Sequence, residues 1–192
     1  MAVDFEFRKK AVRSLPAGIG VYILCDLDNV PIYVGQSKDG IRKRVARHLT
    51  SARSDIIANR QLDVWEIAYV WAYPVESRDE ITPLEAKLFV HFNSQSALIN
   101  GAAMTYAGET TAIPDPAMMV QVMTDDEISE RRDPVQRLPR QASHYAQIVS
   151  HFLAVKNSTQ IARAMSAHFE RLRRYHGTLL GSAVPDEDAV EE

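Results

Sequence analysis

Two short apolar segments constrain the fold more than any other feature of the chain. They are GVYILC at residues 20–25 and VPIYVG at residues 30–35, both rich in Val, Ile and Tyr. The four residues between them, DLDN, favour a turn. The pattern predicts a β-hairpin with Tyr22 and Tyr33 on neighbouring strands, where strand alternation can turn both phenols to one face. Simple cross-strand packing of the two rings is the alternative interpretation.

A basic helix is predicted directly after the hairpin. In IRKRVARHLTSA, residues 41–52, the apolar residues Ile41, Val45 and Leu49 are four positions apart, and mostly basic residues lie between them. Arg44 and His48 are four residues apart, so they share one side of this helix. Arg42 and Arg47 replace Arg44 as candidates if the register differs by a turn.

A third strand and a second helix follow. LDVWEIAYVWAYPV, residues 62–75, is aromatic and β-branched and predicts a buried strand. Ser77 and Glu80 have the spacing of a capping box, so we expect a helix from about residue 79 to 92. Glu85 is one of few carboxylates in this otherwise apolar helix. Glu80 competes with it as a functional acid but is better explained as a cap.

The second half of the chain has weaker patterns. Residues 100–119 contain two glycines and two prolines, and the stretch 102–140 is predicted to be a linker or irregular. Within it, TDDEISERRD could form one short helix capped by Thr124. Residues 141–178 predict a pair of helices as a C-terminal extension, with Ser158 capping the second helix and Gly177 ending it. The acidic tail at 182–192 is expected to be disordered. The extension has three candidate roles: packing on the first domain, binding DNA, or building a homodimer.

Charge is distributed unevenly along the chain. The net charge of −3 argues against a protein that is basic overall, but the segment from Gln36 to Arg60 holds seven Lys or Arg against two acids. A local patch of this kind decides where a polyanion can dock.

The single cysteine, Cys25, excludes an internal disulfide and lies in an apolar run, which is typical of inert core packing. The N-terminus has no signal-peptide pattern, and no stretch has the ~18 apolar residues that a membrane-spanning helix needs. We therefore expect a cytoplasmic protein without a membrane partner.

Tyrosines, an arginine, a histidine and a carboxylate together suit phosphodiester cleavage. A carboxylate can hold a hard divalent cation that polarises the phosphate, and an arginine fork can neutralise the charge of a pentavalent phosphate. A phenol near a metal and cations can lose its proton more easily than its reference pKa of ~10 suggests, and can then accept a proton from water. The chain has no CxxC pair, no HExxH and no phosphate-binding glycine loop, so zinc enzymes and NTPases are poorly supported.

The ordered set of residues resembles the GIY-YIG endonuclease family. Gly20-Val21-Tyr22 stands where the family has GIY, and Tyr33-Val34-Gly35 where it has YIG. The family's later functional positions are matched by Arg44, His48, Glu85 and Asn100. The resemblance covers about residues 14–101 and implies an α/β fold, a small three-stranded sheet flanked by helices, followed here by the helical C-terminal extension.

The resemblance also implies a role for each matched residue in the first half of the motif. Tyr22 would act as the general base for water or would orient it, and Tyr33 would lie beside the metal and the phosphate. Arg44 would grip the scissile phosphate. His48 would assist proton movement or contact phosphate. His48 also has a purely structural interpretation.

Two further roles complete the implied site. Glu85 would be the one protein ligand of Mg²⁺ or Mn²⁺, and Asn100 would hold the site or the phosphate in place. Asn100 before Gly101 can also be a helix-exit turn. We place contacts to nucleic acid on Gln36, Lys38, Arg42, Lys43, Arg47 and Arg53. For Gln36 and Lys38 a solvated loop is the alternative.

The sequence therefore predicts a metal-dependent DNA endonuclease that uses a tyrosine-assisted water. The substrate is single- or double-stranded DNA, and restriction-like cutting, single-strand-specific cutting and repair of branched DNA all stay open. A catalytically idle nucleic-acid-binding module on the same fold is the alternative. A structural protein that binds a partner through its C-terminal helices is a third hypothesis.

Overall fold

The computed structural model describes residues 4–50, 62–109, 112–155 and 157–181. Arg53 and the predicted acidic tail lie outside the described residues. The helices in this part of the chain are α1 (Phe5–Ser14), α2 (Ile41–Thr50), η1 (Val64–Glu66), η2 (Arg78–Glu80), α4 (Ile81–Gln95), α5 (Asp125–Arg132), α6 (Pro134–Ala154) and α7 (Thr159–Leu179). The strands are β1 (Gly20–Cys25), β2 (Pro31–Ser37), β3 (Tyr69–Pro74) and β4 (Met118–Gln121).

The described strands form a single antiparallel sheet in the order β2-β1-β3-β4. The prediction of three strands was wrong by one, because β4 comes from the stretch predicted to be irregular. Its sequence, MMVQ, is only four residues long and gives no usable alternation. It becomes a strand through its pairing with β3, in which Tyr69 faces Gln121 and Val70 faces Val120.

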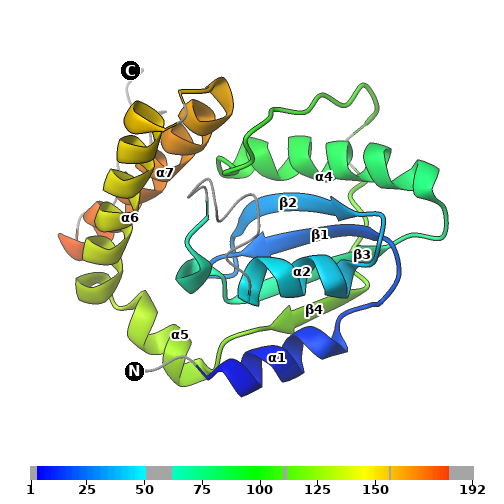
Figure 1. Ribbon diagram of the computed structural model, residues 1–192, viewed down its shortest axis with the longest axis horizontal. Helices are drawn as coiled ribbons and strands as arrows, with labels where there is room; N and C mark the ends of the chain where they lie inside the picture. The colour runs from blue at the N-terminus through cyan, green and yellow to red at the C-terminus, as the bar shows by residue number, and fades with distance from the viewer. Residues whose placement is uncertain (1–3, 51–61, 110–111, 156, 182–192) are drawn as a thin grey trace, which may run out of the picture.

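Helices cover both faces of the sheet (Figure 1). On one face, α1 and α2 pack against β1 through a core that includes Val12, Ile41 and Val45. On the other face, α4 contributes Leu88 and Phe89 to a second core. β1 is the central strand, paired with β2 on one side and β3 on the other, and all of its residues are buried.

The turn between β1 and β2 confirms the predicted hairpin. The carboxylate of Asp26 accepts hydrogen bonds from the backbone N–H groups of Asp28 and Val30, at 2.9 and 3.0 Å. Asn29 takes a left-handed conformation with φ of 58°, which Asn tolerates better than most residues. The segment DLDN thus forms the turn through its own side-chain hydrogen bonds and through the backbone conformation of Asn29.

The predicted helix around Glu85 is confirmed with shifted ends. Ser77 and Glu80 form the capping box, which starts the short 3₁₀ turn η2 rather than α4 itself. α4 runs from Ile81 to Gln95, so Pro83 falls in its first turn, where a missing N–H does no harm.

The stretch 102–140 is irregular in its described residues only up to 117, and it then contains β4, α5 and the start of α6. α6 therefore begins before the predicted residue 141. Ser158 caps α7 as predicted. Gly177 does not end that helix, which continues to Leu179. Gly181, with φ of 67°, supplies the left-handed residue just beyond the helix end.

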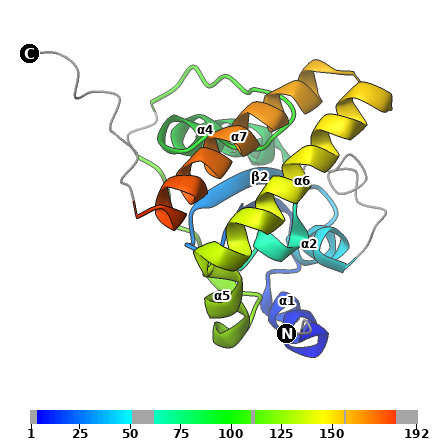
Figure 2. The same cartoon turned by 90° about the vertical axis from the view of Figure 1, so that its left-hand side faces the viewer.

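α6 and α7 lie side by side at one end of the sheet (Figure 2) and are attached there by buried ion pairs. Arg137 of α6 donates to Glu66 and to Asp28, and its guanidinium lies 4.0 Å from the ring centre of Tyr175. Arg171 of α7 donates to Asp26 at 3.0 Å. Burial of these arginines against acids removes them from any surface for nucleic acid, and it favours packing among the three candidate roles of the extension.

Within the described residues, no helix combines the length and apolar character that crossing a bilayer requires. Cys25 is a buried free thiol, in agreement with the prediction of core packing.

Candidate active site

The hairpin brings the two predicted phenols together on the face covered by α2. Tyr22 is opposite Gly35 and Leu24 is opposite Tyr33, so the two tyrosines are diagonal neighbours. Their ring centres lie 6.3 Å apart with an angle of 34° between the planes. Tyr22 is completely buried, whereas Tyr33 is partly exposed.

Gly35 leaves the space that these rings occupy. A Cβ atom on Gly35 would lie 2.5 Å from Oη of Tyr22 and 2.7 Å from Cε1 of Tyr33. Both distances are far below van der Waals contact, so any side chain here would displace a phenol. The glycine at this position is therefore a requirement of the ring packing and not only of a turn.

His48 reaches the first phenol from the last turn of α2. Its Nε2 lies 2.7 Å from Oη of Tyr22, and the imidazole is 1% exposed. Burial, with a further contribution from the positive charge of Arg44, lowers the pKa of His48 from 6.5 to about 4. The imidazole is thus neutral near pH 7, and in one tautomer its Nε2 accepts the phenol proton.

The Tyr22 phenol is neutral as well. Burial is the largest cause that raises the pKa of Tyr22 well above 10, and the neighbouring Tyr33 adds to it. A hydrogen bond and the charge of Arg44 act in the opposite direction but do not outweigh burial. In the protein alone, the phenol therefore loses its proton less easily than a free tyrosine, contrary to the direction expected from the nearby cation.

Arg44 lies one turn before His48 and is half-buried. Arg44 is near enough to the Tyr22 phenol to oppose the rise of its pKa, while Nε of Arg44 is buried without a hydrogen-bond partner in the described part of the chain. A buried charged donor of this kind is expensive unless an acceptor meets it. An anionic oxygen, such as a phosphate oxygen, would satisfy it.

A groove of about 300 Å³ opens beside Arg44. The residues that line it are Gln36, Ser37, Lys38, Asp39, Lys43, Arg44 and Arg47. Lys38, Lys43 and Arg47 are exposed, as residues that contact phosphate must be. The structure thus brings together most of the predicted nucleic-acid contacts. Arg42 is exposed too but lies outside this groove, and its Nε donates to the carbonyl of Leu15.

Glu85 approaches the site from α4, on the opposite face of the sheet. Its carboxylate is 7% exposed and accepts a hydrogen bond of 2.7 Å from Nε2 of Gln36. Burial raises the pKa of Glu85, and the Gln36 hydrogen bond and the charge of Lys38 oppose that effect. The carboxylate does not point away into solvent, and its charge is near enough to contribute to the raised pKa of Tyr22.

Gln36 was predicted as a contact to phosphate, and the structure gives it another role as the partner of Glu85. Because Gly35 faces α2, strand alternation turns Gln36 toward α4. Gln36 directly follows the Tyr-Val-Gly motif, so strand alternation could have placed its side chain on the face opposite Gly35. The sequence alone does not indicate that its partner on that face is Glu85.

Asn100 holds the outer edge of β2. Its Oδ1 accepts from the N–H of Val34 at 3.0 Å, and its Nδ2 donates to the carbonyl of Val34 at 2.7 Å. The amide replaces the strand neighbour that an edge strand lacks. Because Asn100 fixes the strand at Val34, between Tyr33 and Gly35, these contacts fit the expectation that Asn100 holds the site in place.

The donor set around Glu85 fits a weakly held divalent cation. The described residues contain no group of three or more His, Cys, Asp or Glu side chains that could enclose a metal ion. However, Oε1 of Gln36 is a buried acceptor without a partner in those residues, and it belongs to the same side chain that binds Glu85. A hard cation with a water shell would satisfy this oxygen directly or through one of its waters.

Residues 18–100 match the family model of the GIY-YIG catalytic domain. The match confirms the resemblance inferred from the two tyrosine motifs, and it assigns this segment to a family of nucleases. No curated protein matches the chain.

Proposed function

Because residues 18–100 match the GIY-YIG catalytic domain, we propose that this protein is a metal-dependent endonuclease that hydrolyses phosphodiester bonds in DNA. The observation that carries the proposal is the buried Tyr22–His48 hydrogen bond of 2.7 Å beside Arg44, whose Nε lacks a partner in the described residues. Arg44 lines a basic groove, and His48, the proton acceptor, lies one helical turn after it on α2.

Tyr22 and His48 supply the route for the proton of the attacking water. As the water oxygen forms its bond to phosphorus, its proton moves to Oη of Tyr22, and the phenol proton moves to Nε2 of His48. The phosphorus–oxygen bond to the leaving group then breaks and the leaving oxygen takes a proton from solvent, while His48 releases the proton it received to solvent and becomes neutral again. A neutral His48 is required for this route, and its pKa of about 4 keeps it neutral at pH 7.

Arg44 holds the phosphate at the start of this route. Its unpartnered Nε would donate to a non-bridging phosphate oxygen and stabilise the charge that grows during attack. The same guanidinium lies near enough to Tyr22 to influence the pKa of its phenol, so a phosphate held by Arg44 would lie close to that phenol.

Glu85 and Gln36 would hold Mg²⁺ or Mn²⁺, which supplies Lewis-acid stabilisation of the leaving oxygen when it is bound. Burial of the Glu85 carboxylate lowers its hydration, and Gln36 orients it. One carboxylate gives weak affinity, so we expect the cation to bind chiefly together with DNA.

The substrate backbone would follow the basic groove of Lys38, Lys43 and Arg47. These contacts neutralise phosphates and give affinity without sequence information. Both single-stranded and duplex DNA fit this description. We further propose a cytoplasmic enzyme. Cutting both strands of a duplex favours a homodimer, whereas nicking and single-strand cutting suit a monomer.

The test is a nuclease assay on supercoiled plasmid and on single-stranded circles with Mg²⁺ or Mn²⁺. We compare the wild type with Glu85→Ala and with Glu80→Ala, which removes an acid from the cap of the same helix region. We expect cleavage by the wild type and by Glu80→Ala but not by Glu85→Ala. Binding of DNA without cleavage by any of the three proteins would instead identify an idle binding module.

A further inference from the structure

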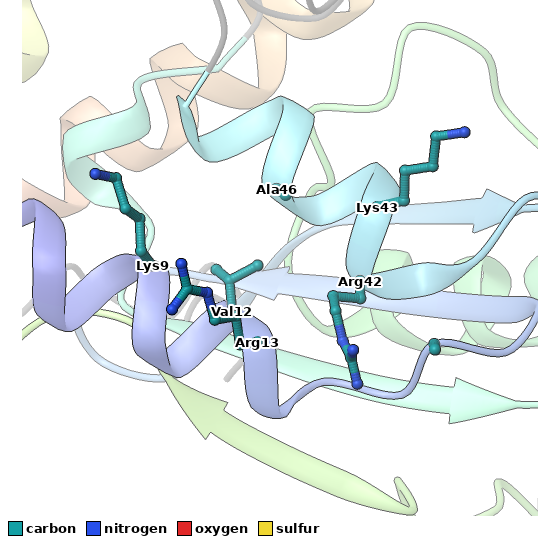
Figure 3. Close-up of a pocket in the computed structure, with 7 residues that line it drawn as sticks. Lys9, Val12, Arg13, Arg42, Lys43 and Ala46 are labelled. Carbon is teal, nitrogen blue, oxygen red and sulfur yellow. The ribbon is translucent and has the colours of Figure 1, made fainter.

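A second groove, of about 390 Å³, lies between α1 and α2 (Figure 3). Lys9 and Arg13 line it from α1, and Arg42 and Lys43 line it from α2. The remaining lining residues are apolar and small, namely Val12, Ala17 and Ala46. α1 precedes the segment that matches the family domain, so half of these basic side chains come from outside that domain.

The groove is positively charged, and none of the described residues that line it is an acid. Lys9 and Arg13 are four residues apart and therefore project from the same side of α1. Lys9 pairs with Glu6 at 2.7 Å, but both side chains are at least half exposed, and such a surface pair holds a lysine weakly. Arg42 is fixed by the hydrogen bond from its Nε to the carbonyl of Leu15, which anchors its charge at the groove.

Lys43 connects this groove with the candidate active site. Its side chain lines both the α1–α2 groove and the groove that contains Arg44 and Gln36. Because Lys43 lines both grooves, the basic residues of α1 adjoin those of the candidate site. A floor made of Val12 and Ala46 offers apolar contact to sugar rings while the cations around it face phosphates.

From this charge complementarity and continuity, we propose that the α1–α2 groove binds the phosphate backbone of the substrate DNA next to the bond that is cut. The inference rests on the proposed function, because it takes DNA as the polyanion. It adds Lys9 and Arg13 of α1 as contacts to DNA that position the substrate, beyond the contacts predicted on α2.

The test compares Arg13→Glu with Lys10→Glu. Lys10 is an exposed residue of the same helix that does not line the groove, and both variants change the net charge by the same amount. The Kd for a DNA duplex that is long enough to cover both grooves is measured over a series of salt concentrations, with metal chelated so that nothing is cut. A single-stranded DNA of the same length serves as a second probe.

We expect Arg13→Glu to raise the Kd and to reduce the slope of log Kd against log salt by about 1, because one phosphate contact is lost. Lys10→Glu should keep the wild-type slope. Equal slopes and equal affinities for the two variants on both probes would overturn the inference. A melting curve for each variant tests whether the charge reversal disturbs folding. If it does, the milder Arg13→Gln replaces Arg13→Glu in the binding measurement.

Binding and cleavage separate this inference from the proposed function. If the wild type cuts DNA and Arg13→Glu has no effect on binding, the inference about the α1–α2 groove is wrong while the nuclease proposal stands. If the wild type cuts nothing but Arg13→Glu alone weakens binding, the groove stands and the hydrolytic proposal fails.

Discussion

The phenol oxygen of Tyr22 lies 2.7 Å from Nε2 of His48, and neither side chain is more than 1% exposed. The contact links the protonation of His48 to folding as well as to chemistry. The folded-state pKa of His48, about 4, is below the ordinary value of 6.5, so the unfolded chain binds the proton more tightly.

The first prediction concerns stability against pH. The contribution of His48 is fully present above pH 6.5, and it is lost as the pH falls from about 6.5 to about 4, with a total on the order of 3 kcal/mol. Urea unfolding of the wild type and of His48→Gln at several pH values measures it. As the pH falls, the unfolding free energy of the wild type should decrease relative to that of His48→Gln. A constant difference across this window would contradict a buried neutral imidazole.

The second prediction concerns Gly35. A Cβ at this position would overlap both phenol rings, so Gly35→Ala should reduce cleavage by about 10²-fold and lower the unfolding free energy by ~1–3 kcal/mol. Gly18→Ala is the matched control, because a Cβ there has no atom within 4 Å. Cleavage rates and urea unfolding measure the two effects. Full activity of Gly35→Ala would show that the rings are not fixed as described.

The third prediction concerns Gln36. Its loss removes the amide that orients Glu85, so Gln36→Ala should raise the Mn²⁺ concentration for half-maximal cleavage by about 10- to 100-fold. Saturating Mn²⁺ should restore much of the rate. Gln95→Ala, at the far end of α4, is the control and should behave as the wild type. An unchanged Mn²⁺ requirement in Gln36→Ala would contradict the claim that Gln36 orients Glu85 for metal binding.

The fourth prediction concerns the attachment of the C-terminal helices. Arg137 is 5% exposed and donates to Glu66, which is itself buried. Arg137→Ala removes one of the two arginines that pair with Glu66, while Arg140 and Gln141 still contact Oε2 of that carboxylate. The unfolding free energy should therefore fall by about 3 kcal/mol, the lower end of the cost of breaking a buried ion pair. Arg132→Ala, an exposed arginine, should change it by less than about 0.5 kcal/mol. Similar unfolding curves for both variants would mean that α6 is held by other contacts.

The sequence predicts the hairpin and the first half of the site because the signals there are local. Alternating Val, Ile and Tyr, the turn DLDN and the four-residue spacing of Arg44 and His48 each act within one element. The capping box of Ser77 and Glu80 likewise places the helix that carries Glu85. Local rules of this kind survive folding because tertiary contacts agree with them.

The features that were missed depend on contacts between distant residues. β4 is a strand through its pairing with β3, and Gln36 meets Glu85 although 49 positions separate them. Gly177 is an ordinary helix-ending residue by sequence, but in the structure it is buried inside α7, which runs on to Leu179. α6 includes Pro134 in its first turn and Pro139 in its interior, which together obscure its helical pattern.

The most direct measurement of the central claim is the single-turnover rate of DNA cleavage by the wild type and by Tyr22→Phe. The variant keeps the ring packing of Tyr22 and removes only the oxygen that contacts His48. We predict a loss of at least about 10²-fold in rate with an unchanged Kd for DNA. Cleavage at the wild-type rate by Tyr22→Phe would contradict the account, because the proton of the attacking water would then not pass through this phenol.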